Sequence, residues 1–418
     1  MTYMDFLHAA IDPGLPVHHP ASFGRFDVAA HATRYQGGGG GGTSTQIVEG
    51  AQPSPAGAMV PFRRATTGRT TTIEQTSLAA VTAAEQPVEI QVEGSGYVYG
   101  IDVEFDIETA ANAAAVAFHE DAPWNVISSI VYSDVNGQLV NLPGYSLHLL
   151  NLYGGHAIAR DEDSTDETIF EQVTGAVGRG GSVHAHLWVP IGLNRRTLLG
   201  IVGNQSQNQK YQLRTNVNGS GQIYTTAPTA AGAVQIDRTY HNYAVPQGEN
   251  SNRQRQQTEP PKFGVLSFAT QIVSTALPTD NSTRNHFLGR IGNTIRLLGL
   301  VFRDGNGASA RADAEANMPT QLQFQLGDTP LFTEGVGARR REMRQRYGFD
   351  APNGVLVYDW ITDIVQRAGA ELGDDYLFTE GLNNAQFQVT YGAGWAANSS
   401  LTIITSDLIV PPGVNLYS

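Results

Sequence analysis

The sequence predicts an all-β protein built from two β-sandwich modules in tandem. Gly and Pro account for 46 and 20 of the 418 residues, which interrupts the chain too often for long helices and suits short strands joined by turns. Apolar and polar residues alternate with a period of two in two series of segments, and a polar, proline-containing stretch separates the series. A chain of this length can hold two or three domains and bury a core without disulfides or metal ions.

Composition excludes several classes of protein. Hydrophobic residues make up 41% and charged residues 16%, so the chain is neither disordered nor a coiled coil. A net charge of −13 makes direct nucleic-acid binding unexpected, because that binding needs clustered Lys and Arg. The absence of cysteine excludes thiol catalysis and thiolate metal sites. The sequence shows neither a secretory signal nor an apolar run of about 20 residues, so we expect assembly in a cytoplasm.

Residues 1–64 are predicted to form an extended N-terminal arm. Their charges cancel, and six prolines and a six-glycine run at 37–42 prevent them from forming a core of their own. Residues 3–11 carry apolar side chains at helical spacing, which suits docking on a partner; the alternative is a disordered tail. We expect an arm that becomes ordered in an assembly. Its predicted inter-subunit contacts are Tyr3, Met4, Phe6 and Leu7.

Residues 65–245 contain the first series of predicted strands. Val88, Ile90 and Val92 alternate with polar residues, as in a strand with one buried and one solvated face. Asn136-Gly137 follows a dense apolar run and is a strong hairpin signal. The predicted strands span residues 88–92, 97–107, 126–132, 138–142, 183–191, 211–217 and 234–243, with a short helix over 147–152.

Residues 246–262 are predicted to be a linker, because they combine a polar run with Pro260-Pro261. The second module, residues 263–418, repeats the order of the first: strands, a glycine-rich hairpin, a short helix and more strands. Sequence identity between the halves is not evident, so the predicted repeat is architectural. Its predicted strands span residues 265–273, 291–302, 321–326, 355–360, 387–391 and 401–410, with a helix over 335–347.

Three features of the sequence resemble ligand-binding motifs, but each also has a purely structural explanation. The glycine run at 37–42 lacks the Gly-Lys-Ser/Thr ending of a phosphate-binding loop. His184 and His186 share one face of a predicted strand, as a metal-binding pair could, but no third ligand is evident beside them and ordinary packing is commoner. The acidic residues at 161–167 lack the glycine of a calcium-binding loop and suit a solvated loop.

No catalytic arrangement is recognisable in the sequence. No Gly-x-Ser-x-Gly elbow precedes a predicted helix. Paired carboxylates for glycoside hydrolysis stay open, because their separation exists only in three dimensions. We therefore expect no catalytic residue, no bound metal and no cofactor.

The predicted helix at 335–347 carries five arginines. At about 100° per residue, Arg340, Arg341 and Arg344 cluster on one side, while Arg339 and Arg346 spread away. A buried cluster of arginines would carry a large desolvation penalty without carboxylate partners. We therefore predict an exposed or interfacial helix, in which Arg340, Arg341 and Arg344 meet acidic groups of a neighbouring subunit.

Three groups of segments carry a family resemblance. Residues 122–134 (APWNVISSIVYSD) are followed by 144–151 (GYSLHLLN), residues 186–191 read HLWVPI, and residues 338–341 (ARRR) precede 352–359 (PNGVLVYD). Their order and spacing resemble the major capsid proteins of tectiviruses, over about residues 85–410 at low identity. The resemblance implies a double jelly-roll, with two eight-stranded sandwiches in each chain and three chains in each capsomer.

The resemblance implies a structural protein of an icosahedral phage with an internal membrane, located in the virion and not an enzyme. Its expected partners are its own copies, as a homotrimer and as neighbouring trimers, and minor capsid and vertex proteins, with an internal membrane as a possible contact of the arm. The competing hypothesis is a phage β-sandwich protein that binds or degrades carbohydrate. An exposed row of aromatic residues, or two facing carboxylates in a groove, would favour that alternative.

Overall fold

The computed structural model describes residues 59–416 except for 93–95, 110–111, 113, 135, 157–169, 176–179, 196, 206–210, 279, 281, 305–310, 313–317, 362–374, 393–394, 396–397, 413 and 415. The arm contacts predicted at Tyr3, Met4, Phe6 and Leu7 lie outside the described residues, as do the glycine run at 37–42 and the acidic loop at 161–167. The chain between Gly57 and Ser418 is one compact unit.

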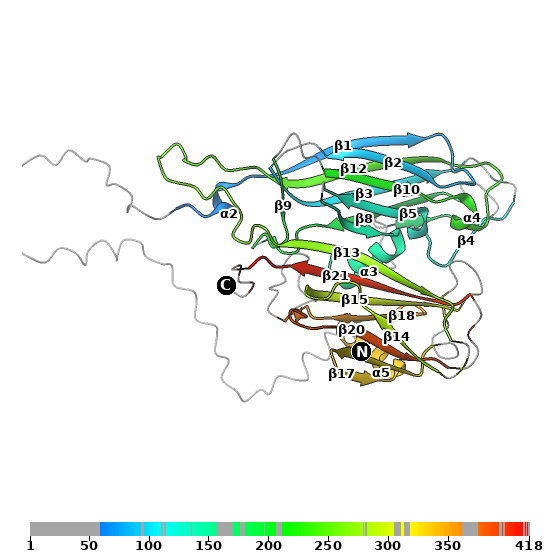
Figure 1. The fold of residues 1–418 in the computed structure, drawn as a ribbon. Helices are drawn as coiled ribbons and strands as arrows, with labels where there is room; N and C mark the ends of the chain where they lie inside the picture. The colour runs from blue at the N-terminus through cyan, green and yellow to red at the C-terminus, as the bar shows by residue number, and fades with distance from the viewer. Residues whose placement is uncertain are drawn as a thin grey trace, which may run out of the picture. The chain divides into compact units, whose positions relative to one another are not determined.

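The first half of this unit contains eight long strands in two facing sheets (Figure 1). One sheet has the order β1-β12-β3-β8 and the other β2-β10-β5-β6. Burial alternates along the strands, as in β2, because every second side chain points into the space between the sheets. The strands are β1 (Gly68–Leu78), β2 (Gln86–Val92), β3 (Gly96–Glu108), β5 (Ile127–Ser133), β6 (Gln138–Leu142), β8 (Val183–Pro190), β10 (Tyr211–Val217) and β12 (Ala233–Tyr243).

The second half repeats this arrangement with eight further long strands. One sheet has the order β13-β21-β15-β18 and the other β14-β20-β16-β17. The strands are β13 (Leu266–Thr275), β14 (Thr283–Phe287), β15 (Thr294–Arg303), β16 (Gln321–Leu326), β17 (Thr329–Glu334), β18 (Val355–Asp359), β20 (Ala385–Thr390) and β21 (Ser400–Ile409).

The two sandwiches have the same topology. When the eight long strands of each half are counted along the chain, one sheet holds strands 1, 8, 3 and 6 and the other holds strands 2, 7, 4 and 5. This is the strand order of a jelly-roll, in which Greek-key connections carry the chain back and forth between two sheets. Each half also places a helix after its fifth strand, α3 (Gly144–Tyr153) in the first and α5 (Val336–Tyr347) in the second. The predicted architectural repeat is therefore present.

Short elements lie before the first long strand and in the connections between the long strands. None of the helices in the described part of the chain is long and apolar enough to span a membrane. The short elements are α2 (Phe62–Ala65), β4 (Ala117–Phe118), η1 (Trp124–Val126), β7 (Phe170–Gln172), β9 (Val202–Asn204), α4 (Ser220–Ile223), β11 (Tyr224–Thr226) and β19 (Leu377–Phe378).

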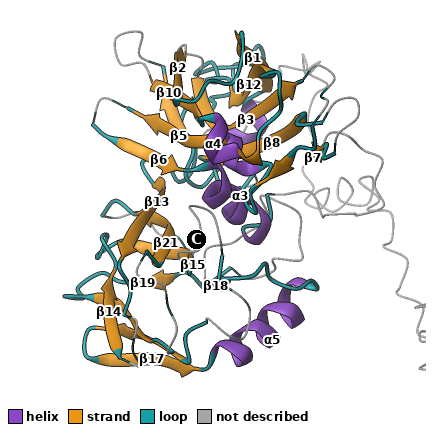
Figure 2. Ribbon diagram, turned by 90° about the vertical axis from the view of Figure 1, so that its right-hand side faces the viewer, coloured by secondary structure: helices purple, strands orange, loops and turns teal. Residues whose placement is uncertain are grey.

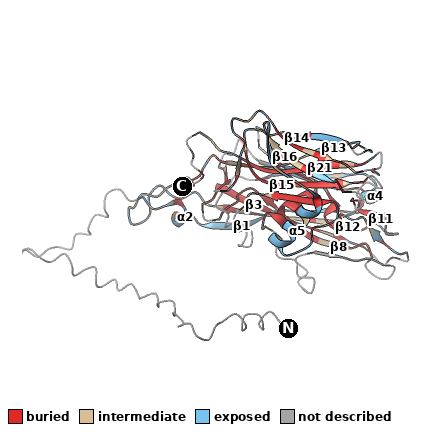
Figure 3. Ribbon diagram, turned by 90° about the horizontal axis from the view of Figure 1, so that it is seen from below, coloured by how far each residue is buried: buried red, intermediate tan, exposed pale blue. Residues whose placement is uncertain are grey.

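One sheet continues from the first sandwich into the second. β13 pairs in parallel with β6 at Ala269 and Val140, so that β2, β10, β5 and β6 join β13, β21, β15 and β18 in a single sheet. Figure 2 shows β6 and β13 side by side where the halves meet. The inner strands of the second half are covered on both faces, and nine of the ten residues of β15 are buried (Figure 3). The sequence of such a strand is a continuous apolar run rather than an alternating one, as in residues 297–302 (LLGLVF) of β15.

The folded unit begins earlier than the predicted arm boundary at residue 64. Phe62, on α2, is completely buried beside Tyr97, Leu198 and Ile201. Its ring meets that of Tyr97 edge-on at 5.3 Å between centroids. The predicted linker at 246–262 contains no strand or helix but is tied to the start of the unit, where the Val60 amide donates to the Arg255 carbonyl at 2.8 Å.

A carboxyl group is buried in the continuous sheet. Asp407 on β21 is 2% exposed and lies in register between Phe268 of β13 and Ile295 of β15. One of its oxygens accepts a hydrogen bond from the Asn293 side chain. Burial raises the pKa of the Asp407 carboxyl to about 6, although the Asn293 hydrogen bond and Arg290 oppose the shift. The folded state therefore binds a proton at this site at a pH where the unfolded chain does not.

Replacing Asp407 with Asn is expected to change how stability depends on pH. Because the pKa is higher in the folded state, the wild type should lose stability from this group as pH rises from about 4 to 6. The variant lacks that loss, so its stability relative to wild type should increase by about 2–3 kcal/mol between pH 4 and pH 7.5. Urea unfolding at both pH values measures the difference, with the exposed Glu89→Gln change on β2 as a control. An equal offset at both pH values would contradict this assignment.

Candidate functional site

Helix α5 forms at the position that the sequence predicts. It spans Val336–Tyr347 and ends at Gly348, whose left-handed conformation (φ 79°) lets its amide donate to the Arg344 carbonyl. Val336, Arg339 and Met343 are the buried residues of the helix. Their spacing of three and four places them on one face, toward the neighbouring strand β18.

Arg339 faces inward, apart from the predicted cluster of Arg340, Arg341 and Arg344. Its Nε donates to the Val357 carbonyl at 2.8 Å, and its Nη1 donates to Glu342 at 2.7 Å. The guanidinium also lies 4.2 Å from the centroid of the Tyr358 ring. This arginine is buried at low cost, because a carboxylate, a carbonyl and an aromatic face replace its contacts with water.

The three arginines predicted as inter-subunit contacts have different surroundings. Arg340 is half-buried and donates from Nη2 to the Ala351 carbonyl at 2.8 Å. Arg344 forms an ion pair with Asp350 at 3.5 Å, in which both side chains are about 70% exposed. Arg341 is exposed. The structure therefore leaves Arg341 and Arg344 as the accessible cations of this group, and their contact with a neighbour stays a prediction.

The carboxyl end of α3 meets the second sandwich through a buried arginine. Arg296 of β15 is 1% exposed, and its Nη2 donates to the Gly154 carbonyl at 2.9 Å. A cation at this end of a helix offsets the negative end of the helix dipole. Glycine suits position 154, because a Cβ there would lie 2.4 Å from the Leu150 carbonyl oxygen and 2.9 Å from the same nitrogen. Burial and the charge of Arg296 lower the pKa of neighbouring His156 to about 3, so this imidazole is neutral.

A second set of charges joins the two sandwiches at the opposite end of β15. Arg303 donates to the Asp121 carboxylate at 2.5 Å, and Arg311 Nε lies 3.3 Å from the other oxygen of that carboxylate. Arg311 also donates to the Tyr145 hydroxyl of α3 at 3.0 Å. Burial raises the pKa of the Asp121 carboxyl against the opposing effect of both arginines. Loss of Asp121 would remove the buried carboxylate that both arginines share.

A polar cavity of about 210 Å³ lies beside this network. Its lining includes Asp121 and Tyr145 from the first half and Gln271, Arg303 and Thr402 from the second. Of the lining side chains, Ser146 donates to Gln271 at 2.9 Å and so adds a further link across the joint. Asp121 is the one carboxylate in this lining, so the cavity does not supply the facing pair of carboxylates that glycoside hydrolysis requires.

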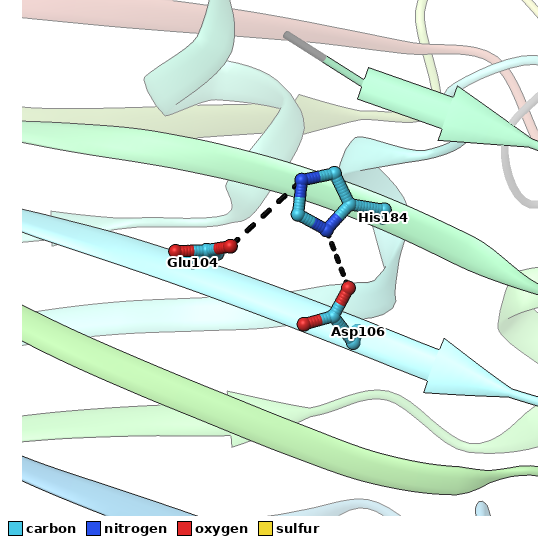
Figure 4. Close-up of side chains that lie close together, drawn as sticks. All are labelled: Glu104, Asp106 and His184. Atoms are coloured by element: carbon cyan, nitrogen blue, oxygen red, sulfur yellow. Dashed lines mark hydrogen bonds and ion pairs between the residues drawn. The ribbon is translucent and has the colours of Figure 1, made fainter. Parts of the chain in front are cut away.

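The predicted histidine pair lies on the outer face of the first sandwich. His184 and His186 of β8 both point away from the core, as their spacing predicts, and each meets a carboxylate of the adjacent strand β3. His184 lies between Asp106 and Glu104, with 3.8 Å between its Nε2 and Glu104 Oε1 (Figure 4). His186 Nδ1 lies 3.2 Å from Asp102, and this hydrogen bond raises the pKa of His186.

Trp124 and Trp395 are buried, and Trp188 and Trp360 are half-buried. Trp124 stacks on the His148 ring at 4.1 Å, and Trp395 meets Tyr391 edge-on at 5.6 Å. Trp188 and Trp360 are half-buried and pack against Tyr99 and Phe324. They do not form the exposed aromatic row that would favour the carbohydrate hypothesis.

The sequence analysis did not predict the charged residues that link the two sandwiches. These residues, here called the joint, are Asp121, Arg296, Arg303 and Arg311. Arg296 was open to detection, because an arginine inside an otherwise apolar strand must find a buried partner. Asp121 and Arg311 lie in connections, and their partners come from the other half of the chain. Only the pairing of the two sandwiches brings these groups together.

The structure is similar to solved structures of viral capsid proteins. No protein-family model and no curated protein matches the sequence. The crystal structure of the STIV major capsid protein matches with a TM-score of 0.56 at 13% identity, over 82% of this chain and 97% of that chain. The PBCV-1 virus capsid protein matches with a TM-score of 0.54 at 13% identity, over 83% of this chain and 95% of that chain. The predicted resemblance is confirmed at the level of the fold: the chain has the double jelly-roll fold of viral major capsid proteins.

Proposed function

We propose that this chain is the structural major capsid protein of an icosahedral phage with an internal membrane, and that three copies form one pseudo-hexagonal capsomer. The observation that carries the proposal is the pair of jelly-rolls with identical strand order, joined by a continuous sheet. Three chains with two similar sandwiches present six similar units around a threefold axis. Such a trimer can occupy a lattice position with six neighbours.

The chemistry of the chain is compatible with this role. The net charge of −13 suits a shell that a membrane separates from the genome, because an acidic protein would repel a phosphate backbone. In this proposal the chain acts without enzymatic chemistry, is located in the virion and assembles in the host cytoplasm. Its partners are neighbouring trimers and minor capsid and vertex proteins, and the arm of residues 1–64 reaches a neighbouring trimer or the membrane.

The oligomeric state tests the proposed function. Purified protein at micromolar concentration should scatter light as a particle of three times 44.9 kDa, because a capsomer must form a large and stable interface. Negative-stain images of the same sample should show particles with a pseudo-hexagonal outline. A stable monomer of 44.9 kDa would argue against the capsid role.

Arginines of α5 are expected to act in assembly rather than in folding. Changing Arg341 and Arg344 to Glu removes one exposed ion pair, which is worth about 0–1 kcal/mol, so the trimer should keep its melting temperature. The same change should weaken association between trimers, as measured by sedimentation of higher assemblies.

The matched control for this prediction is Arg339→Met on the same helix. It leaves the Val357 carbonyl and Glu342 without their buried donor and should lower the free energy of unfolding by about 1–3 kcal/mol. If the double variant loses comparable stability and still assembles normally, Arg341 and Arg344 belong to an intramolecular network instead.

A further inference from the structure

The outer face of the β3–β8 strand pair gathers carboxylates around two histidines. In the antiparallel register, Asp106 lies opposite His184 and Glu104 lies opposite His186. On the other side of β3, Asp237 of β12 lies opposite Glu104. Like charges on directly opposed residues destabilise a sheet unless a cation lies among them. Among the described residues, the ion pairs of Asp102, Glu104 and Asp106 are with histidines alone.

His184 has a carboxylate at each of its two ring nitrogens. Nδ1 bonds to Asp106, and Nε2 lies 3.8 Å from Glu104 Oε1 (Figure 4). A neutral imidazole has one N–H, so it can donate to only one of these carboxylates, and its other nitrogen then directs a lone pair at a negative oxygen. A metal ion bound to the ring and to a carboxylate oxygen would remove this repulsion.

The distances suit a metal ion. One ligand atom from each of Glu104, Asp106 and His184 lies within 4.8 Å of the others. In a tetrahedral site with bonds of about 2.0–2.1 Å, ligand atoms lie about 3.3 Å apart, so the side chains must rotate to bring both carboxylates to one ring nitrogen of His184. His184 is 24% exposed and Glu104 is 50% exposed, so an ion has access from solvent and can keep water as a further ligand.

We propose that Glu104, Asp106 and His184 form a binding site for a divalent transition-metal ion of the Zn²⁺ class. An imidazole nitrogen with two carboxylate oxygens favours such ions over Ca²⁺ and Mg²⁺, which prefer oxygen ligands alone. The ion links β3 to β8 and neutralises the carboxylates on this face of the sheet. The site goes beyond the proposed capsid role and does not depend on it.

The strand pair itself supplies a matched control. His186 and Asp102 lie on the same two strands and form the same kind of pair, at 3.2 Å, but they are not part of the three-residue cluster. Asp102→Asn and Glu104→Gln each remove one negative charge from the same face of β3. A site made by Glu104, Asp106 and His184 responds to the second change and not to the first.

The test is calorimetric titration of Zn²⁺ into the tag-free full chain after chelator treatment and dialysis. We expect one saturable site per chain, at least about tenfold weaker binding in Glu104→Gln, Asp106→Asn and His184→Gln, and a change of less than about twofold in Asp102→Asn. Zn²⁺ should also raise the melting temperature of the wild type and of Asp102→Asn, but not that of Glu104→Gln. Circular dichroism of each variant confirms that it is folded.

Two outcomes would overturn the proposal. Absence of saturable Zn²⁺ binding at about 0.1 mM, in the range of weak affinities, would show that Glu104, Asp106 and His184 do not form a metal site. Equal weakening by Asp102→Asn and Glu104→Gln would show a diffuse attraction of cations to an acidic surface rather than a site. Neither outcome bears on the capsid role, which the oligomeric state tests separately.

Discussion

The pairing of β6 with β13 is the constraint on which the rest of the structure depends. It turns two jelly-rolls into one body by extending a single sheet through both. The inner strands of this sheet are buried almost throughout: nine of the ten residues of β15 and eight of the ten residues of β21 are buried. Charged groups that remain at this joint need partners from the opposite half, as Arg303 finds in Asp121.

Much of this fold was predictable from the sequence, because local period and turn chemistry survive in the folded chain. The strand predicted over 211–217 has the same bounds as β10, and α5 begins one residue after the predicted start. Polar strands such as β14 and β17, at an edge of their sheet, were not predicted, since their residues do not alternate clearly. Interactions across strands were also inaccessible, because Glu104 and Asp106 approach His184 only through the β3–β8 register.

The charged groups between the two sandwiches and those on the outer surface have different roles. Buried pairs such as Arg296 with the Gly154 carbonyl hold the two sandwiches in one orientation, as the proposed capsomer would require. Outward-facing charged groups form ion pairs that are exposed to solvent. The Arg344–Asp350 pair is largely exposed, and the β3–β8 carboxylates face solvent. Association with other copies can use such groups without disturbing the core, because surface ion pairs contribute little to folding.

Calorimetric unfolding tests the central claim, that the two jelly-rolls form one cooperative unit, most directly. If the continuous sheet and the Asp121–Arg303 pair couple the halves, the wild-type chain should unfold in a single transition whose calorimetric and van't Hoff enthalpies agree for the unfolding species. Breaking the pair with Arg303→Met should lower the temperature of that one transition. Two resolved transitions in the wild type, with only one of them shifted by Arg303→Met, would show that the sandwiches fold independently and would contradict the account.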